Sequence, residues 1–437
     1  MKSSFVKRML RSALSGRALL QVNTRSFQTC SFSFGQGLQG ALGLGNTEDV
    51  YEPDAMSPLQ LPATVSKLVA GHFHSLALTQ EGELWGWGRN VEGQLGHAQE
   101  MVCCTPSRIA PDLLEHHLVE AAASAVCSLA VDKQGRVWAW GTSKRGQLGL
   151  GPDTTHTLAA LPIPGLEGIA HVACGWGHAA AVTYDGELWT WGYPQHGRLG
   201  HSFATHPSQE AESEVMSRCV WAPRRVSALE GVSIKQVVCG ADHTLAVTSD
   251  NQLLSFGDSS LQQLGRSAEE LPGSLASTPE ASSWLVNNAD GSSLPICKVA
   301  AGLAHCLALT PDGLLYSWGW NAAGCLGLGE PGRHQHDVSR PTQVYGVPHN
   351  PNGVIAAGRA HSMLLSEDLL PDPVEEPPQV KGTSTQLFAW GSGAQGRLGS
   401  GTQIGCIQPE LCDALEGQPM LHVACGYDHT LVLARAV

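Results

Sequence analysis

The sequence predicts an all-β fold: a seven-bladed β-propeller of four-stranded antiparallel blades, whose ring is closed by pairing of the N- and C-terminal segments. Three observations predict it. The composition is rich in glycine and tryptophan, two short motifs recur along the chain, and the chain begins and ends with complementary halves of one repeat.

The composition favours short strands and tight turns. Among 437 residues there are 50 glycines, well above the average usage of about 7%. Twelve tryptophans stand against six tyrosines, and charged residues make up only 15%. No apolar run approaches the roughly 18 residues of a membrane-spanning helix, and the glycines lack the three-residue period of collagen. These features exclude a helical membrane protein and a fibrous protein.

The first motif is an aromatic residue and glycine followed, after a short variable stretch, by Leu-Gly. Its seven copies are marked by the glycines at 35, 88, 141, 192, 257, 319 and 391. The first intervals are 53, 53 and 51 residues, and the later ones are 62 to 72. A period of about 50 residues is typical of propeller blades. The longer intervals indicate insertions near 202–220, 267–294 and 367–384.

The second motif is Gly-x-x-His followed by an apolar run, just upstream of the first. Turn doublets such as Glu81-Gly82 and Asp185-Gly186 separate the two motifs, and runs such as Leu84–Trp87 alternate with period two. Acid-Gly doublets between alternating runs indicate antiparallel hairpins. Each repeat is therefore expected to be one small sheet.

The chain ends decide between a closed ring and an open solenoid. The chain starts its repeats with a lone first motif at 32–35 and ends with a lone second motif at 423–433. Pairing these halves completes the seventh blade and removes exposed sheet edges. An open solenoid would gain nothing from such a split repeat.

The recurring aromatic and histidine positions are expected to be structural. The tryptophans should fill the gaps between blades, and the histidines should form hydrogen bonds, because equivalent positions in different blades surround a wide axis and cannot converge on one metal ion. The second copy has Cys127 in place of the histidine. The structural set comprises Trp87, Trp140, Trp191, Trp318, Trp390, His74, His178, His243, His305, His361 and His429.

No arrangement of residues predicts chemistry. Two Gly-x-Gly-x-x-Gly matches, at 35–40 and 391–396, lead into Leu-Gly and not into a helix, so they are turns and not dinucleotide sites. Thirteen cysteines include no Cys-x-x-Cys pair, which is typical of free thiols in a reducing compartment. We therefore predict no catalytic residue, no metal site, no cofactor and no enzymatic activity of its own.

Residues 1–27 have the composition of a mitochondrial transit peptide. They contain six basic residues, many serines and apolar residues at helical spacing, while the first acidic residue is Glu48. Cleavage after Phe27 would change the net charge from −13 to −19. A plastid transit peptide or a basic nucleic-acid-binding arm are the alternatives. Such an acidic body disfavours broad nucleic-acid binding.

The sequence resembles the regulator of chromosome condensation propeller family over residues 31–437. The resemblance rests on the order of its motifs: Gly-x-x-His, a turn, a strand ending in Trp-Gly, and Gly-Gln-Leu-Gly. The resemblance implies a seven-bladed propeller. Members of the family include a nuclear exchange factor for a small GTPase, a plant ultraviolet-B receptor that depends on repeated Trp-Arg pairs, and mitochondrial proteins with a presequence. Here only Trp176 matches such a pair, and Gly177 follows it.

The variable residues of the first motif should gather on one face of the ring and either bind a partner or form a solvated rim. They are Arg89, Glu92, Lys144, Arg145, His196, Arg198 and Arg397. Together with the presequence, the resemblance implies a scaffold of the mitochondrial matrix that supports organellar RNA processing or translation and respiratory complex assembly. Its partners would be proteins such as RNA-processing or ribosome factors. The alternative is an exchange factor for a small GTPase.

Overall fold

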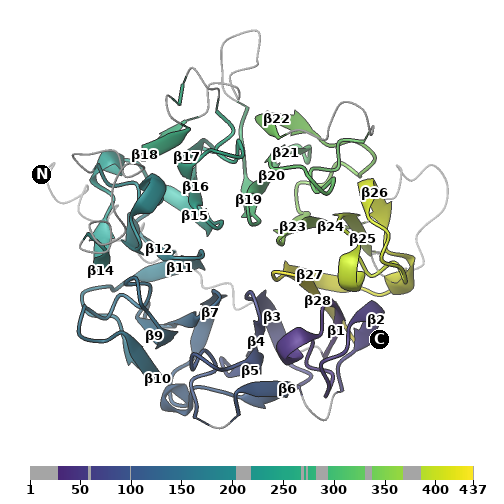
Figure 1. Ribbon diagram of the computed structural model, residues 1–437, viewed down its shortest axis with the longest axis horizontal. Coiled ribbons are helices and arrows are strands. Elements are labelled where there is room, and N and C mark those ends of the chain that lie inside the picture. Colours follow the sequence, from purple (N-terminus) through teal and green to yellow (C-terminus); the bar gives the residue numbers. More distant parts are fainter. Residues whose placement is uncertain are drawn as a thin grey trace, which may run out of the picture.

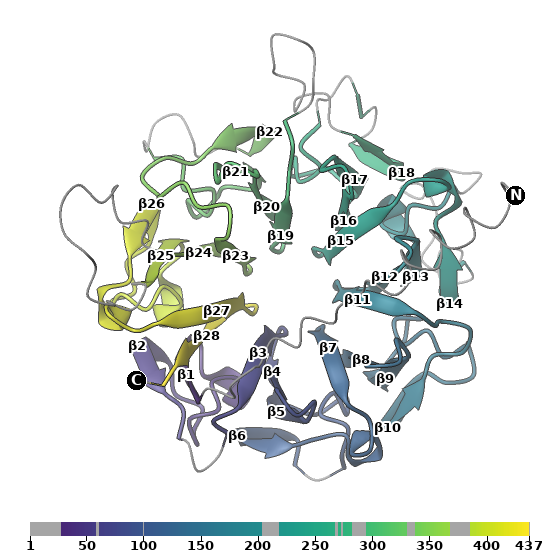
Figure 2. The same cartoon turned by 180° about the vertical axis from the view of Figure 1, so that it is seen from behind.

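The predicted fold is confirmed: seven four-stranded antiparallel sheets surround a central axis (Figures 1 and 2). The computed structural model describes residues 28–57, 61–98, 100–202, 218–266, 270–271, 274–281, 294–329, 337–367 and 385–436. The expected presequence, 1–27, and most of the three expected insertions lie outside the described residues.

Blade 1 closes the ring from both ends of the chain. It consists of β27 (Met420–Cys425), β28 (His429–Arg435), β1 (Thr29–Gly35) and β2 (Val50–Ala55). Strand β1 pairs with β28 over its whole length, from Thr29 opposite Arg435 to Gly35 opposite His429. The open solenoid is thereby excluded.

The other blades each use four consecutive strands. Blade 2 contains β3 (Val65–Ala70), β4 (His74–Thr79), β5 (Leu84–Arg89) and β6 (Val102–Arg108). Blade 3 contains β7 (Leu118–Ala123), β8 (Cys127–Asp132), β9 (Val137–Thr142) and β10 (His156–Pro162). Blade 4 contains β11 (Ile169–Cys174), β12 (His178–Thr183), β13 (Leu188–Gly192) and β14 (Val220–Arg225).

Blade 5 contains β15 (Ile234–Cys239), β16 (His243–Thr248), β17 (Leu253–Asp258) and β18 (Leu275–Ala281). Blade 6 contains β19 (Lys298–Ala301), β20 (His305–Leu309), β21 (Leu315–Gly319) and β22 (Val338–Gln343). Blade 7 contains β23 (Val354–Ala357), β24 (His361–Glu367), β25 (Thr385–Gly391) and β26 (Cys406–Leu411). The short 3₁₀ helices are η1 (Leu38–Gly40), η2 (Pro111–Leu113), η3 (Gln195–Gly197), η5 (Ser227–Leu229), η7 (Ala394–Gly396) and η8 (Asp413–Leu415).

The two faces of the ring carry different connections. Strands β3, β7, β11, β15, β19, β23 and β27 lie innermost (Figure 2). Both repeated motifs place their loops at one face, because Gly88, one residue before the end of β5, is paired with His74 at the start of β4. We call this the loop face. The opposite hairpin face carries turns such as Glu81-Gly82. In the part of the chain that the structure describes, no helix has the length and apolar character of a membrane span.

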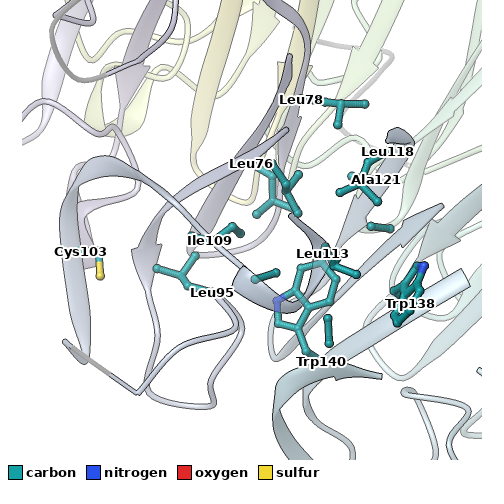
Figure 3. Close-up of a cluster of buried hydrophobic side chains, with 14 residues drawn as sticks. Leu76, Leu78, Leu95, Cys103, Ile109, Leu113, Leu118, Ala121, Trp138 and Trp140 are labelled. Carbon is teal, nitrogen blue, oxygen red and sulfur yellow. The ribbon is translucent and has the colours of Figure 1, made fainter. Parts of the chain in front are cut away.

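The hydrophobic core lies between adjacent blades. At the joint of blades 2 and 3, Leu76, Leu95, Ile109, Leu118 and Trp140 pack into one buried cluster (Figure 3). Trp140 is fully buried there. Similar clusters occupy the neighbouring joints, so each blade is held mainly by its two neighbours. The ring is thus a rigid frame that presents the loops at its faces.

Candidate binding face

The repeated histidines lie at the joints between blades, fully buried on the loop-face side. In each, Nε2 forms a hydrogen bond with a hydroxyl or thiol of the next blade, at the position that follows the next blade's own histidine or, in blade 3, Cys127. The pairs are His74–Ser128 (2.9 Å), His178–Thr244 (2.9 Å), His243–Cys306 (3.2 Å), His305–Ser362 (2.9 Å), His361–Thr430 (3.1 Å) and His429–Ser75 (2.9 Å).

Burial keeps these histidines neutral. It lowers the pKa of His74 and His305 to about 3 and that of His243 and His429 to about 4. A neutral imidazole can take part in the interblade bond without an uncompensated buried charge. Among the described residues, no group of three or more His, Cys, Asp or Glu side chains is placed to hold a metal ion.

The glycine of Gly-x-x-His makes room for the imidazole ring. A Cβ built on Gly240 would lie 2.0 Å from Cε1 of His243, and one built on Gly358 would lie 2.2 Å from Cε1 of His361. These separations are far shorter than a van der Waals contact. The spacing of the motif is therefore set by a ring lying directly over a residue without a side chain.

The five tryptophans are fully buried, and each anchors its blade to the preceding one. The indole Nε1 donates to the carbonyl oxygen of the residue before Leu-Gly in that preceding blade. The bonds run from Trp87 to Ala41 (2.8 Å), Trp140 to Gln94 (2.8 Å), Trp191 to Gln147 (2.8 Å), Trp318 to Gln263 (3.0 Å) and Trp390 to Cys325 (2.9 Å). Each tryptophan thus combines a large apolar contact with a satisfied polar group.

Arg198 and Arg397 are not exposed, although their position in the variable loops led us to expect them on the rim. Both are buried, with exposed fractions of 3% and 1%. Nη1 of Arg198 lies 2.6 Å from Asp242 of the next blade, and Arg397 pairs in the same way with Asp428. They tie two joints together and do not reach solvent.

The remaining loop residues lie nearer the surface. Arg89 and Glu92 form an ion pair with one another, so neither side chain is free. Lys144 is exposed, and the guanidinium of Arg145 lies 4.4 Å from the centre of the Tyr193 ring. His196 is half-buried in η3, with a positive φ of 60°. These residues are spread around the loop face and do not converge on one point.

The residues that do converge were not predicted from the sequence. His72, Phe73, Trp176 and Tyr427 form an aromatic cluster at the centre of the loop face, with ring centres 5.3–6.4 Å apart. The indole Nε1 of Trp176 donates to Nδ1 of His72 (2.7 Å), which links blade 4 to blade 2 across the axis. The signal was present in the variable positions of Gly-x-x-His, but aromatics occur there in only some repeats.

Arginines border this aromatic cluster. The guanidinium of Arg359 lies 4.9 Å from the centre of the Tyr427 ring, and it also forms two contacts with Asp428, at 2.9 and 2.8 Å. Arg89 lies 5.9 Å from the centre of the Phe73 ring. Trp176 retains an exposed fraction of 45%. His72, Phe73 and Tyr427 are half-buried, so Trp176 is the exposed part of the cluster. Aromatic side chains bordered by arginine are enriched at the hot spots of protein interfaces.

The repeat architecture is matched by a known family model. Residues 30–432 match the RCC1-like domain. The chain belongs to the RCC1-like domain family. The chain is also similar to the Arabidopsis thaliana ultraviolet-B receptor UVR8, with 33% identity over 386 residues, which cover 88% of this chain and 77% of that protein.

Two further relatives differ in their cellular context. The Arabidopsis thaliana RCC1 domain-containing protein RUG3, mitochondrial, is 29% identical, over 68% of this chain and 63% of that protein. The human regulator of chromosome condensation is 27% identical, over 95% of this chain and 94% of that protein. The match to the human E3 ubiquitin-protein ligase HERC2 covers only 7% of the length of that protein. The activities of these whole proteins therefore remain properties of those proteins.

A solved structure has the same fold. Prp20p from Saccharomyces cerevisiae, described with its binding properties to Gsp1p and histones, superposes with a TM-score of 0.77 over 94% of this chain and 92% of that chain, at 24% identity. This likeness concerns the propeller alone.

Proposed function

We propose that this propeller is a protein-binding scaffold of the mitochondrial matrix, which supports organellar RNA processing or translation and the assembly of respiratory complexes. The proposal assigns the protein no chemistry of its own. The RUG3 relative, named as mitochondrial, and the basic, acid-free N-terminal sequence support the compartment. The acidic net charge of −13 favours protein partners over a nucleic-acid backbone.

The aromatic cluster with Arg359 is the observation that carries the binding role. Trp, Tyr and Arg are the residues most enriched at binding hot spots, and here they lie together at the centre of one face. The frame beneath them is a closed ring of sheets, so little conformational freedom is lost when a partner docks.

Proximity labelling in mitochondria tests the binding face. We expect Trp176→Ala to lose the labelled partners of the wild-type protein. Tyr184→Ala is the matched control, because Tyr184 is an aromatic of the same blade with an exposed fraction of 62%, at the turn of the hairpin face. If both variants keep the same partners, the loop-face centre is not the binding surface.

Localisation is tested separately. A fluorescent fusion carrying residues 1–40 should enter mitochondria, and the same fusion with the six basic residues of 1–27 changed to glutamine should remain outside. If the first fusion stays in the cytosol, the compartment and the organellar role are both wrong.

The rival function is nucleotide exchange on a small GTPase. It is favoured by the match to the human regulator of chromosome condensation, which covers nearly the full length of both chains. Purified protein that accelerates GDP release from a mitochondrial GTPase would support the rival. Association with RNA-processing or ribosome factors without exchange activity would support the scaffold.

A further inference from the structure

The axis of the ring carries a second chemical environment, at the end opposite the aromatic cluster. A cavity of about 670 Å³ lies among the innermost strands. Its walls toward the loop face consist mainly of small residues such as Ala70, Ala123 and Cys174. Its volume falls within the range of small-molecule sites, roughly 300–1,000 Å³.

Charged and polar residues gather near the hairpin-face end of this cavity. They occupy one register position, just before the small-residue run of each inner strand, and include Lys67, Glu120, His171, Gln236 and Lys298. Lys235 lines the cavity beside them. Because the position repeats around the axis, side chains from several blades contribute to one site.

The positive charges at this end outnumber the negative ones. Lys67 forms an ion pair with Glu120, and Nδ1 of His171 lies 3.7 Å from the same carboxylate. Among the described residues, Lys298 Nζ donates to the carbonyl oxygens of Asn352 and Gly353, both at 3.0 Å, and pairs with no carboxylate. Glu120 is thus the one carboxylate among the described residues that line the cavity, against three ammonium groups.

The ammonium groups of Lys235 and Lys298, which the described part of the chain pairs with neutral acceptors, retain donors for a ligand. Lys235 Nζ donates to the side-chain oxygen of Asn251, which is neutral, as are the two carbonyl acceptors of Lys298. A neutral acceptor does not cancel the charge, and an ammonium group has three donors. At the same register on β27, the buried Nδ1 of His422 has no hydrogen-bond partner among the described residues. It lies close enough to Lys67 for that charge to lower the pKa of His422, in addition to the larger effect of burial.

We propose that this axial cavity binds a small oxyanion, a phosphate or a carboxylate, with Lys235 and Lys298 as its cationic ligands. Charge-assisted hydrogen bonds from lysine are a common means of holding such anions. A positive opening in an acidic protein also concentrates small anions locally. Both lysines lie at the hairpin-face end of the axis, at the opposite end from the aromatic cluster.

Calorimetric titration of the full chain tests the site, with inorganic phosphate and citrate as separate probes. We expect saturable binding of one anion per chain for at least one of the two probes. Lys235→Gln with Lys298→Gln should weaken it by about tenfold or more, the worth of a charged hydrogen bond. Lys298→Arg should retain binding. The control Lys133→Gln removes an exposed lysine outside the cavity and should have no effect.

A second measurement uses the wild-type chain and does not depend on how the variants fold. The bound anion should slow alkylation of Cys297, which lines the cavity, and leave Cys104 on the outer strand β6 unaffected. Protection by phosphate alone or by citrate alone supports the proposal and identifies the anion. The proposal is overturned if neither probe saturates, or if the double variant binds as the wild type does.

Discussion

Six of the joints between blades contain the hydrogen bond from a buried histidine to the next blade. The joint between blades 3 and 4 has other residues at these positions. Three positions differ there together. Cys127 stands for the histidine, Ala179 stands for the hydroxyl or thiol residue that would receive it, and Ser124 stands for the glycine beneath the ring. Ser124 Oγ instead lies 3.2 Å from Sγ of Cys127, within blade 3.

The comparison shows that the interblade bond is one device made of three residues. A serine at position 124 is sterically incompatible with an imidazole at 127, because a Cβ at the equivalent glycines lies 2.0–3.0 Å from a histidine ring atom. Without the histidine, a buried hydroxyl at 179 would lose its imidazole partner and keep only the carbonyl oxygen of Gln147, the equivalent of the Gln94 oxygen that Ser128 binds. The joint of blades 3 and 4 is therefore held by its hydrophobic cluster, which includes Trp191 and Leu148, together with the Trp191–Gln147 hydrogen bond and the interaction of Cys127 with Cys174.

Acid should produce the largest effect, because it acts on all six histidine joints at once. The folded-state pKa values of about 3 to 4 lie below the ordinary value of 6.5, so the unfolded chain binds more protons as the pH falls. Stability is full above pH 6.5 and is lost progressively as the pH falls toward 4. Each unit of lowered pKa costs about 1.4 kcal/mol when the group is protonated.

Circular dichroism measures this loss as a fall in the thermal unfolding midpoint between about pH 7.5 and 4, which spans the pH range of histidine titration. His305→Asn is the control, because it removes one titrating imidazole while retaining a polar side chain. Its midpoint at neutral pH should be lower, but its decline with acid should be shallower than that of the wild type. Equal slopes would show that the joint histidines do not govern acid stability.

Trp191→Ala should have the largest effect of any single substitution at the joint of blades 3 and 4. The change opens a cavity at a fully buried site and removes the donor to Gln147, so we expect a loss of about 3–5 kcal/mol in the free energy of unfolding. Urea titration measures it. Tyr184→Ala, an exposed aromatic of the same blade, should change stability by less than about 0.5 kcal/mol. A small loss for Trp191→Ala would show that this joint is held by other contacts.

Gly240→Ala should destabilise a histidine joint by about 1–3 kcal/mol, the usual cost of overpacking. The added Cβ would meet the His243 ring at 2.0 Å from Cε1. The same urea titration applies. In a His243→Ala background the added methyl group should cost much less, because the ring that it meets is gone. Additive losses in the two backgrounds would contradict the steric account of the motif.

The fold was predictable from sequence because its signal repeats. Seven copies of two motifs average out local ambiguity, and the split repeat at the chain ends fixes ring closure. The aromatic cluster was not predictable in this way. His72, Trp176 and Tyr427 occupy variable positions in three different repeats, and only closure of the ring brings them together.

The ion pairs of the two buried arginines had a signal in the sequence that a consensus of the repeats does not show. Arg198 and Arg397 both precede Leu-Gly, and in both cases the following Gly-x-x-His motif reads Gly-x-Asp-His. These same joints carry Phe256 and Phe34 where the others have tryptophan. The carbonyl oxygens of Arg198 and Arg397 accept from Thr244 and Thr430, not from an indole. Comparing the repeats pair by pair, and not as a consensus, would have found this ion pair.

Converting the joint of blades 3 and 4 to the common design should have the smallest effect and is the sharpest test of the comparison. Ser124→Gly, Cys127→His and Ala179→Ser together should stabilise the joint by about 1 kcal/mol relative to the sum of the separate changes, the net worth of one buried hydrogen bond. Ala179→Ser alone should change stability little, because the new hydroxyl can donate to the carbonyl oxygen of Gln147, as Ser128 does to that of Gln94 at the joint of blades 2 and 3. A multiple-mutant cycle in urea measures the coupling. The triple variant should also become more acid-sensitive, since it buries a seventh joint histidine. If the effects of the three changes on the free energy of unfolding are simply additive, the three residues do not act as a unit. Their differing together from the other repeats is then coincidental.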